Sequence, residues 1–342
     1  MKKIAALLAA SFVALGTPAV AQQPKPLFAA SDPIHIVIQA PLSGLIRSRS
    51  SMPVQGTLTD PTGAALPVAL SARGITRRSA DVCDFPPIRV QFTAPPSQQS
   101  LFVGQKKLKL VTHCKNSPSF QQNLLLEYSA YKMYNLLTPH SFLVRLASID
   151  YRDADGRPII SRLGYFLEDL SDVAKRNGTQ QTRAPERIPA TDLNATDAAR
   201  YALFQHMLAN HDWSMRAGPA GKPCCHNAEL IGPLGPGTAI PIPYDFDFSG
   251  FVNAPYAVPP DELHIASVRQ RVYRGYCIDN PQVIEVARQM RAARPQLMAA
   301  ITSTPGIDPD RAAKAIGFLD GFFADIATDD SVNAKLLRRC VA

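Results

Sequence analysis

The spacing of apolar residues changes along the chain, and this change limits the possible folds more than any other feature. Short runs that alternate apolar and polar residues recur through the first third of the chain, at 35–38, 54–58, 67–70, 88–92 and 107–113. Such alternation predicts β-strands with one buried face. Between 119 and 137 the apolar residues recur instead at the spacing of a helical face, which predicts one long helix.

The remaining chain continues in the same two patterns. Two strands are expected at 141–151 and 158–167, joined by a turn at Asp155-Gly156. Short strand-like pieces follow near 228–231 and 240–244. Helices are expected at 168–177, 197–208, 280–299, 308–326 and 331–339. Thr196 is the expected N-cap of the helix at 197–208.

This order of elements predicts a fold class and a division of the chain. We expect an α+β protein with a two-lobed, protein-kinase-like fold. Its β-rich N-terminal lobe with one long helix would span 22–170, and its mainly helical C-terminal lobe 171–342.

The first 21 residues have the composition of a secretory signal peptide. Lys2 and Lys3 are basic, residues 4–16 are apolar, and Ala19-Val20-Ala21 fits a cleavage site. We therefore expect a periplasmic or secreted protein. The apolar run is too short to span a bilayer and no other run approaches that length, so no transmembrane anchor is expected.

The chain has six cysteines, all after the predicted cleavage site. An even number in a secreted protein favours disulfides, and six cysteines allow 15 pairings if all are used. Cys224 and Cys225 are adjacent, and we expect each of them to have a separate partner.

The formal net charge of the chain is +8. The basic residues are scattered, and neither a long basic tract nor an aromatic-interleaved basic stripe is present, so nucleic-acid binding is not indicated. A mildly positive protein suits phosphate-bearing ligands or an anionic envelope surface.

Acidic and amide side chains stand beside short apolar runs between 208 and 250. They are Asp212, Asn227, Asp245 and Asp247, the last in an Asp-Phe-Ser-Gly sequence close to the D-F-G turn of protein kinases. Mg²⁺ prefers oxygen ligands, and kinases use a base Asp, an Asn and a metal-binding Asp in this order. The segment therefore predicts phosphoryl-transfer chemistry, with the four side chains meeting in one cleft between the lobes.

Several motifs over about 70–300 together resemble a known family. They are the segments at 72–77, 108–120 and 163–169, then Asn210-His211-Asp212 with Asn227, and Tyr244-Asp245-Phe246-Asp247. In this order they look like the motifs of the spore-coat protein H (CotH) kinase-like family, a secreted or envelope branch of the atypical kinase superfamily. The resemblance implies a phosphotransferase that uses Mg²⁺ or Mn²⁺ with ATP and acts on an unknown protein or envelope substrate.

The resemblance implies roles for single residues. Asp212 would be the catalytic base that accepts the proton of the substrate hydroxyl. Asn227 and Asp245 would bind the metal, with Asp247 beside them. Kinases separate the base from the Asn by about four residues, whereas 14 residues lie between Asp212 and Asn227. No G-x-G-x-x-G loop is present, and the family also lacks one.

Two basic residues are alternatives for the contact with the nucleotide phosphates. Either Arg89 or Lys109 would contact phosphate. Glu127 on the long helix would form an ion pair with the one that does. Glu168 ends a strand where a kinase hinge would pass the adenine.

Two other functions remain open from the sequence. A non-catalytic, kinase-like binding module is favoured by the long Asp212–Asn227 spacing and by the unclear phosphate-binding lysine. A metal-dependent phosphoester hydrolase would use Asp245 and Asp247 as ligands, with His113 as the only further candidate. The oligomeric state is not predicted.

Overall fold

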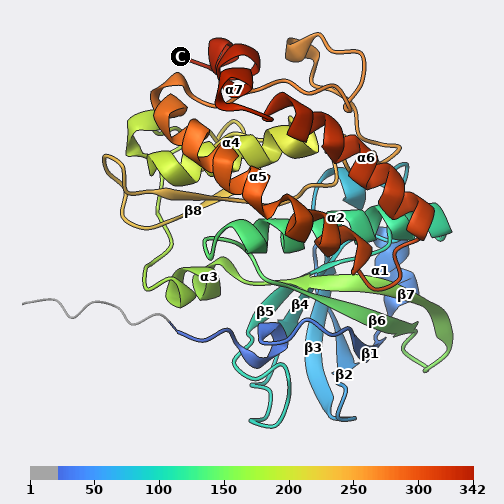
Figure 1. Cartoon of the computed structure of the whole chain (residues 1–342). Coiled ribbons are helices and arrows are strands. Elements are labelled where there is room, and N and C mark those ends of the chain that lie inside the picture. Colours follow the sequence, from blue (N-terminus) through green and yellow to red (C-terminus); the bar gives the residue numbers. More distant parts are fainter. Residues whose placement is uncertain (1–21) are drawn as a thin grey trace, which may run out of the picture.

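Seven β-strands form a closed barrel in the computed structural model, which describes residues 22–342 (Figure 1). The order around the barrel is β1-β2-β3-β4-β5-β7-β6. The strands are β1 (Ile34–Gln39), β2 (Val54–Thr59), β3 (Ala65–Ala72), β4 (Ile88–Phe92), β5 (Lys107–Val111), β6 (Val144–Arg152) and β7 (Pro158–Leu167). The predicted signal peptide, 1–21, lies outside the described residues.

One parallel strand pair closes the barrel. β1 lies parallel to β6, with Ile34 opposite Ala147 and Gln39 opposite Arg152, while every other neighbouring pair is antiparallel. The expected two-lobed kinase-like fold is therefore wrong. The strands predicted from alternation are present, but they form a closed mixed barrel instead of an open sheet in an N-terminal lobe, and seven helices accompany it between residues 22 and 342. Alternation identifies a strand and its buried face, but it does not specify which distant strand becomes its neighbour.

The two faces of β6 and β7 contribute to two separate hydrophobic cores. Ala147 and Phe166 point into the barrel, where they join the apolar residues of β1 to β5. Leu146 and Tyr165 point outward and pack in the second core, which includes the long helix α2 (Pro118–Leu137). Because successive side chains of a strand point to opposite faces, the same two strands join both cores.

Most helices gather on one side of the barrel, where α2 packs between strands β6 and β7 and helix α5 (Asn280–Thr302), whereas α1 (Leu42–Ser48) packs directly on the barrel (Figure 1). The other helices are α3 (Leu170–Arg176), α4 (Ala195–Leu208), α6 (Pro309–Asp325) and α7 (Asp329–Lys335). A two-stranded sheet of β8 (Ala228–Ile231) and β9 (Ile240–Pro243) lies beside α4. Single 3₁₀ turns are at Pro26–Phe28, Thr76–Arg78, Ala190–Asp192, Asp261–Leu263, Cys277–Asp279 and Leu337–Arg339.

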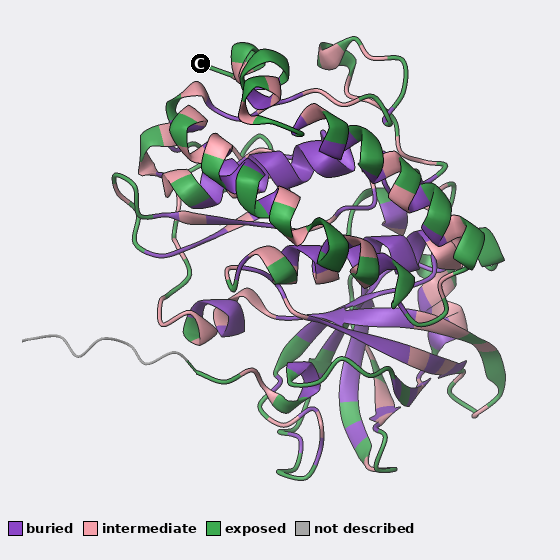
Figure 2. Cartoon of the chain, viewed as in Figure 1, coloured by how far each residue is buried: buried purple, intermediate pink, exposed green. Residues whose placement is uncertain are grey.

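α4 is the central helix of the helical layer and is buried along most of its length (Figure 2). Its N-cap is Asn194, whose side chain accepts a hydrogen bond from the backbone N–H of Asp197, so the prediction of Thr196 as the cap is wrong. Its C-cap is Ala209, in the left-handed conformation with φ 48°. This turn directs the chain away from the helix axis just before Asn210 and Asp212.

All six cysteines form disulfides: Cys83–Cys114, Cys224–Cys225 and Cys277–Cys340. The prediction of disulfides is confirmed, but the prediction of separate partners for the adjacent pair is wrong. Disulfides are compatible with an oxidising compartment such as the periplasm or the exterior. Within the described residues no helix has both the length and the apolar character needed to cross a membrane.

Candidate functional site

Three carboxylates meet where α2 passes the loop that follows β9. One oxygen each of Glu127, Asp245 and Asp247 lies within 4.8 Å of the other two. β9 ends at Pro243, so both aspartates lie in the loop after the strand. Asp245 adopts a left-handed backbone with φ 62°, and its N–H donates to the Tyr131 hydroxyl at 2.8 Å. Thus α2 both supplies Glu127 and holds the loop that carries the aspartates.

Arg77 is the cation that contacts this cluster. Its Nη1 lies 3.1 Å from Glu127 Oε2 and 3.5 Å from Asp247 Oδ2, and all three side chains are almost fully buried. The Tyr256 hydroxyl donates to Asp247 Oδ2 at 2.9 Å. Three carboxylates against one guanidinium leave two negative charges uncompensated when all are ionised, and buried charge without a partner is costly.

The pKa values of the buried carboxyls follow from this excess of negative charge. Burial raises the pKa of Asp247 well above its usual range, and the neighbouring Asp245 raises it further. Burial also raises the pKa of Glu127, against the opposing effect of Arg77. The Tyr165 hydroxyl is near Glu127, but neither it nor Glu127 Oε1 has a partner of hydrogen-bonding geometry among the described residues. The cluster therefore has both excess negative charge and a buried acceptor oxygen that is not satisfied.

Asp212 lies next to this cluster in a hydrogen-bonded group of its own. Asn227 Nδ2 donates to the Asp212 backbone oxygen at 2.7 Å and to its Oδ2 at 2.9 Å. His226 Nε2 lies 2.6 Å from Asp212 Oδ1. The side chain of Asp212 is 37% exposed, so the carboxylate is fixed in place yet open to solvent.

Asp245 connects the two groups electrostatically. The hydrogen bond to Asp212 is the largest factor that raises the pKa of His226, and the charges of Asp212 and Asp245 add to it. The imidazolium form is therefore favoured between the two carboxylates. The separation of 14 residues does not keep Asn227 from Asp212, because the loop between them folds back to place Asn227 against it.

Lys109 and Arg89 both line a cavity of about 260 Å³, together with Asp169 and Glu229. They are opposite each other on β5 and β4. Arg89 is exposed, whereas Lys109 Nζ lies 4.7 Å from the centre of the Tyr244 ring. Burial lowers the pKa of Lys109, and nearby Glu229, Asp245 and Asp169 oppose this effect. Of the two alternatives, Lys109 is the one placed among the acidic side chains.

Glu168 also lines this cavity, but its carboxylate is engaged elsewhere. Arg176 binds both of its oxygens, through Nε at 3.3 Å and Nη2 at 3.1 Å, and the Leu143 N–H donates to Oε2 at 3.0 Å. The side chain thus joins α3 to the start of β6. The assignment of Glu168 as a nucleotide-binding residue stays a prediction.

The sequence did not single out three residues of the site: Arg77, His226 and Tyr256. Arg77 is one of the scattered basic residues. The fold brings Arg77 to Glu127 of α2, so the expected pairing of Glu127 with Arg89 or Lys109 is wrong. The motifs assign no role to His226. Its position directly before Asn227 was a signal that it belongs to the site, because Asn227 was expected in the same cleft as Asp212. Nothing in the sequence distinguishes Tyr256.

No protein-family model matches the chain, and no curated protein sequence matches it. The resemblance to the CotH kinase-like family accordingly stays a prediction from the motifs.

Proposed function

We propose that the protein is a divalent-cation-dependent phosphotransferase that acts in the periplasm or outside the cell. The observation that supports this most directly is the position of Asp245. Its carboxylate belongs to the acidic cluster, and its charge acts on both Lys109 and His226. The proposed cation ligands, the proposed phosphate-binding lysine and the histidine that is hydrogen-bonded to Asp212, the proposed base, would thus all act around one residue.

The acidic cluster has the chemistry of a site for Mg²⁺ or Mn²⁺. Carboxylate oxygens are the ligands that these ions prefer. The excess negative charge and the unsatisfied Glu127 Oε1 fit a divalent cation, held by Asp245 and Asp247 with Glu127 at its edge. A bound cation would supply neutralisation of phosphate charge.

Lys109 and Asp212 would act on the two reactants. The Lys109 ammonium would bind the phosphates of a nucleotide in the cavity beside Asp169 and Glu229. Asp212, oriented by Asn227 and His226, would accept the proton of an acceptor hydroxyl. The hydroxyl oxygen would then bond to the terminal phosphorus as the bond from that phosphorus to the bridging oxygen breaks, leaving a nucleoside diphosphate. Such transfer depends mainly on positioning and charge stabilisation.

Thermal unfolding of the purified protein, with its disulfides formed, tests the binding steps. Mn²⁺ or Mg²⁺ with ATP should raise the free energy of unfolding by about 2.7 kcal/mol at a hundredfold excess over Kd. Asp245→Asn should abolish the shift and Lys109→Met should reduce its nucleotide-dependent part. Asp320→Asn, at an exposed surface ion pair, is the matched control and should keep the full shift.

Turnover separates binding from chemistry. Asp212→Asn should keep the shift with metal and ATP but lose release of nucleoside diphosphate, measured with the wild-type protein as reference. A metal shift that ATP does not increase would favour a structural ion or a phosphoester hydrolase. No shift with any cation and nucleotide would refute the proposal and leave a non-catalytic binding module.

A further inference from the structure

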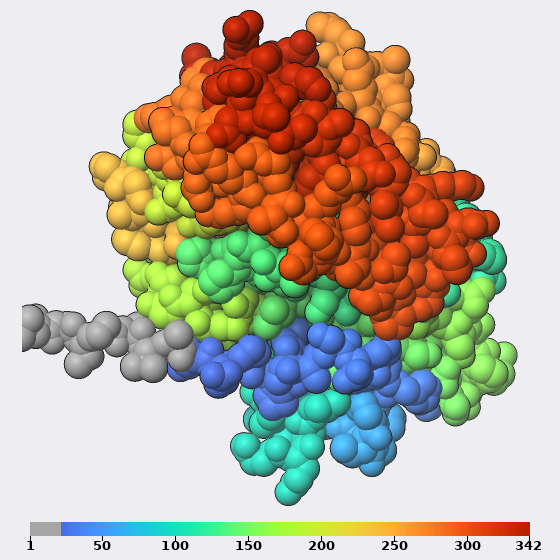
Figure 3. Space-filling view, in the orientation of Figure 1, coloured from blue at the N-terminus to red at the C-terminus, as the bar shows by residue number. Residues whose placement is uncertain are grey.

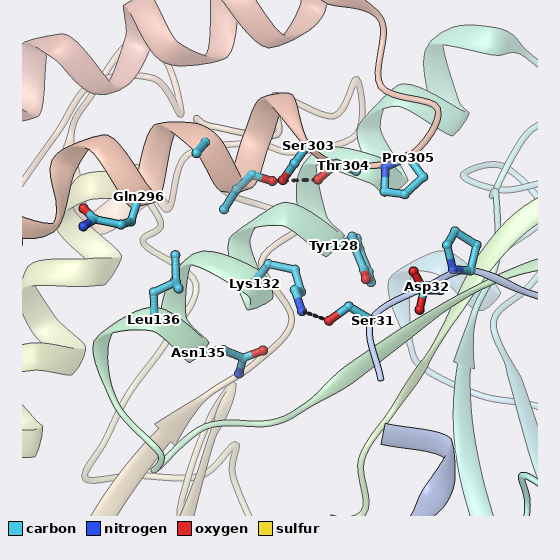
Figure 4. Close-up of a pocket in the computed structure, with 13 residues that line it drawn as sticks. Ser31, Asp32, Tyr128, Lys132, Asn135, Leu136, Gln296, Ser303, Thr304 and Pro305 are labelled. Atoms are coloured by element: carbon cyan, nitrogen blue, oxygen red, sulfur yellow. Dashed lines mark hydrogen bonds between the residues drawn. The ribbon is translucent and has the colours of Figure 1, made fainter. Parts of the chain in front are cut away.

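A second cavity, of about 500 Å³, is lined by Tyr128, Lys132 and Asn135 of α2 (Figure 4). Its walls come from three parts of the chain: residues 31–33 before β1, α2, and the C-terminal end of α5 with the residues after it. Figure 3 shows the N-terminal segment in blue, α2 in green and α5 in orange meeting on one face of the molecule. The volume is within the range of small-molecule sites.

The helical repeat of α2 explains why this cavity is separate from the proposed catalytic site. Tyr128, Lys132 and Asn135, at positions i, i+4 and i+7, form one stripe that faces the cavity. Glu127 and Tyr131 face the acidic cluster instead. One helix therefore presents two unrelated sets of polar groups on two faces.

Most of the cavity wall is apolar, and Lys132 is its cation. Pro33, Leu136, Ala299 and Ala300 contribute apolar surface. Lys132 Nζ donates to Ser31 Oγ at 3.0 Å, which uses one of its three N–H donors. Burial lowers the pKa of Lys132, and Arg145 lowers it further.

Within residues 22–342 no carboxylate pairs with this ammonium. Asp32 also lines the cavity, but its charge acts on Arg145, which holds the 27–30 segment through the carbonyls of Leu27 and Ala30. A partly buried cation without a counter-ion is unfavourable, and an apolar surrounding makes a partner worth more. A second polar atom is also unsatisfied, because Asn135 Oδ1 is buried and accepts no hydrogen bond among the described residues.

We propose that this cavity binds a small carboxylate with an apolar body, whose carboxylate pairs with Lys132. The apolar body would cover the alanine, proline and leucine surface. A hydroxyl or amide N–H next to the ligand carboxylate would donate to Asn135 Oδ1. This site is independent of the proposed phosphotransferase activity and does not require it.

Calorimetric titration of the full protein with sodium octanoate tests the proposal. Octanoate should bind saturably to the wild-type protein, and Lys132→Met should weaken the affinity at least tenfold. Lys222→Met, which removes an exposed lysine from a distant loop, should bind like the wild type. Octan-1-ol, which has the same chain without charge, should bind more weakly than octanoate.

A second variant keeps the test decisive if Lys132→Met does not fold. Ala299→Phe would fill the cavity from α5 and leave Lys132 in place, and it should also abolish octanoate binding. Unchanged octanoate affinity in either variant would overturn the proposal. Absence of saturable binding to the wild type, or equal affinity for octan-1-ol, would overturn it as well.

Discussion

Replacing Arg77 with methionine should destabilise the protein strongly, because Arg77 is the buried cation that contacts Glu127 and Asp247. The relative exposure of the three side chains is 9%, 2% and 7% for Arg77, Glu127 and Asp247. Removing one partner of a buried ion pair typically costs about 3–5 kcal/mol, because the remaining charge stays buried. Here two carboxylates lose their partner, and Asp245 adds a third negative charge nearby. We expect a loss of about 4 kcal/mol in the free energy of unfolding at pH 8.

The loss should depend on pH in a defined direction. Burial already raises the pKa of Asp247 and of Glu127, and removal of Arg77 raises both further. The folded variant then binds protons that the unfolded chain releases, so its stability falls as pH rises above the ordinary carboxyl pKa. The difference from the wild type should therefore be smaller at pH 5 than at pH 8.

Urea unfolding, followed by circular dichroism, measures this difference. The disulfides stay oxidised, and a chelator removes divalent cations that would replace the missing charge. Arg294→Met is the matched control, because Arg294 and Asp320 are about half exposed and such pairs contribute at most about 1 kcal/mol. If Arg77→Met lost no more stability at pH 8 than this control, or if its loss were equal at pH 5, the ion-pair reasoning would be refuted.

Two further predictions concern α4. Asn194→Ala should lower the free energy of unfolding by about 1 kcal/mol, because the cap of the Asp197 N–H is lost, while Asn194→Asp should keep most of it in the same urea assay. His206 is buried, which lowers its pKa to about 4, so the wild type loses stability as pH falls from 6.5 towards 4. Each unit of pKa shift corresponds to 1.36 kcal/mol. His206→Leu should therefore lose about 2–3 kcal/mol less stability than the wild type when the pH falls from 7 to 4.5. An unchanged difference in stability between pH 7 and pH 4.5 in His206→Leu would contradict this reasoning.

Local patterns in the sequence were sufficient for most of the elements. The helix at 119–137 appears as α2, and the alternating segments appear as β1 to β7, because burial of one face depends on residue spacing within the element itself. Exact ends were less accurate. α4 begins at Ala195 because Asn194, and not Thr196, caps it.

Parts of the candidate site were also predictable from residue types and order. Asp212 and Asn227 are hydrogen-bonded, and Asp245 and Asp247 lie together. Arg77 and Tyr256, which contact the acidic cluster, were not predictable. Arg77 reaches Glu127 only because a 3₁₀ turn after β3 faces α2, a contact between elements that are separated in the chain.

The sequence alone determined where strands and helices form, which cysteines are available for disulfides, and which acidic residues are candidates for a site. The tertiary structure decided that β1 pairs with β6 to close a barrel, that Cys224 bonds to its neighbour, and that Arg77 lies among three carboxylates. The physical reason is the range of the interactions. Side-chain spacing within one element is local information, whereas strand pairing and buried charge depend on which distant surfaces bury the most apolar area together and satisfy each other's polar groups.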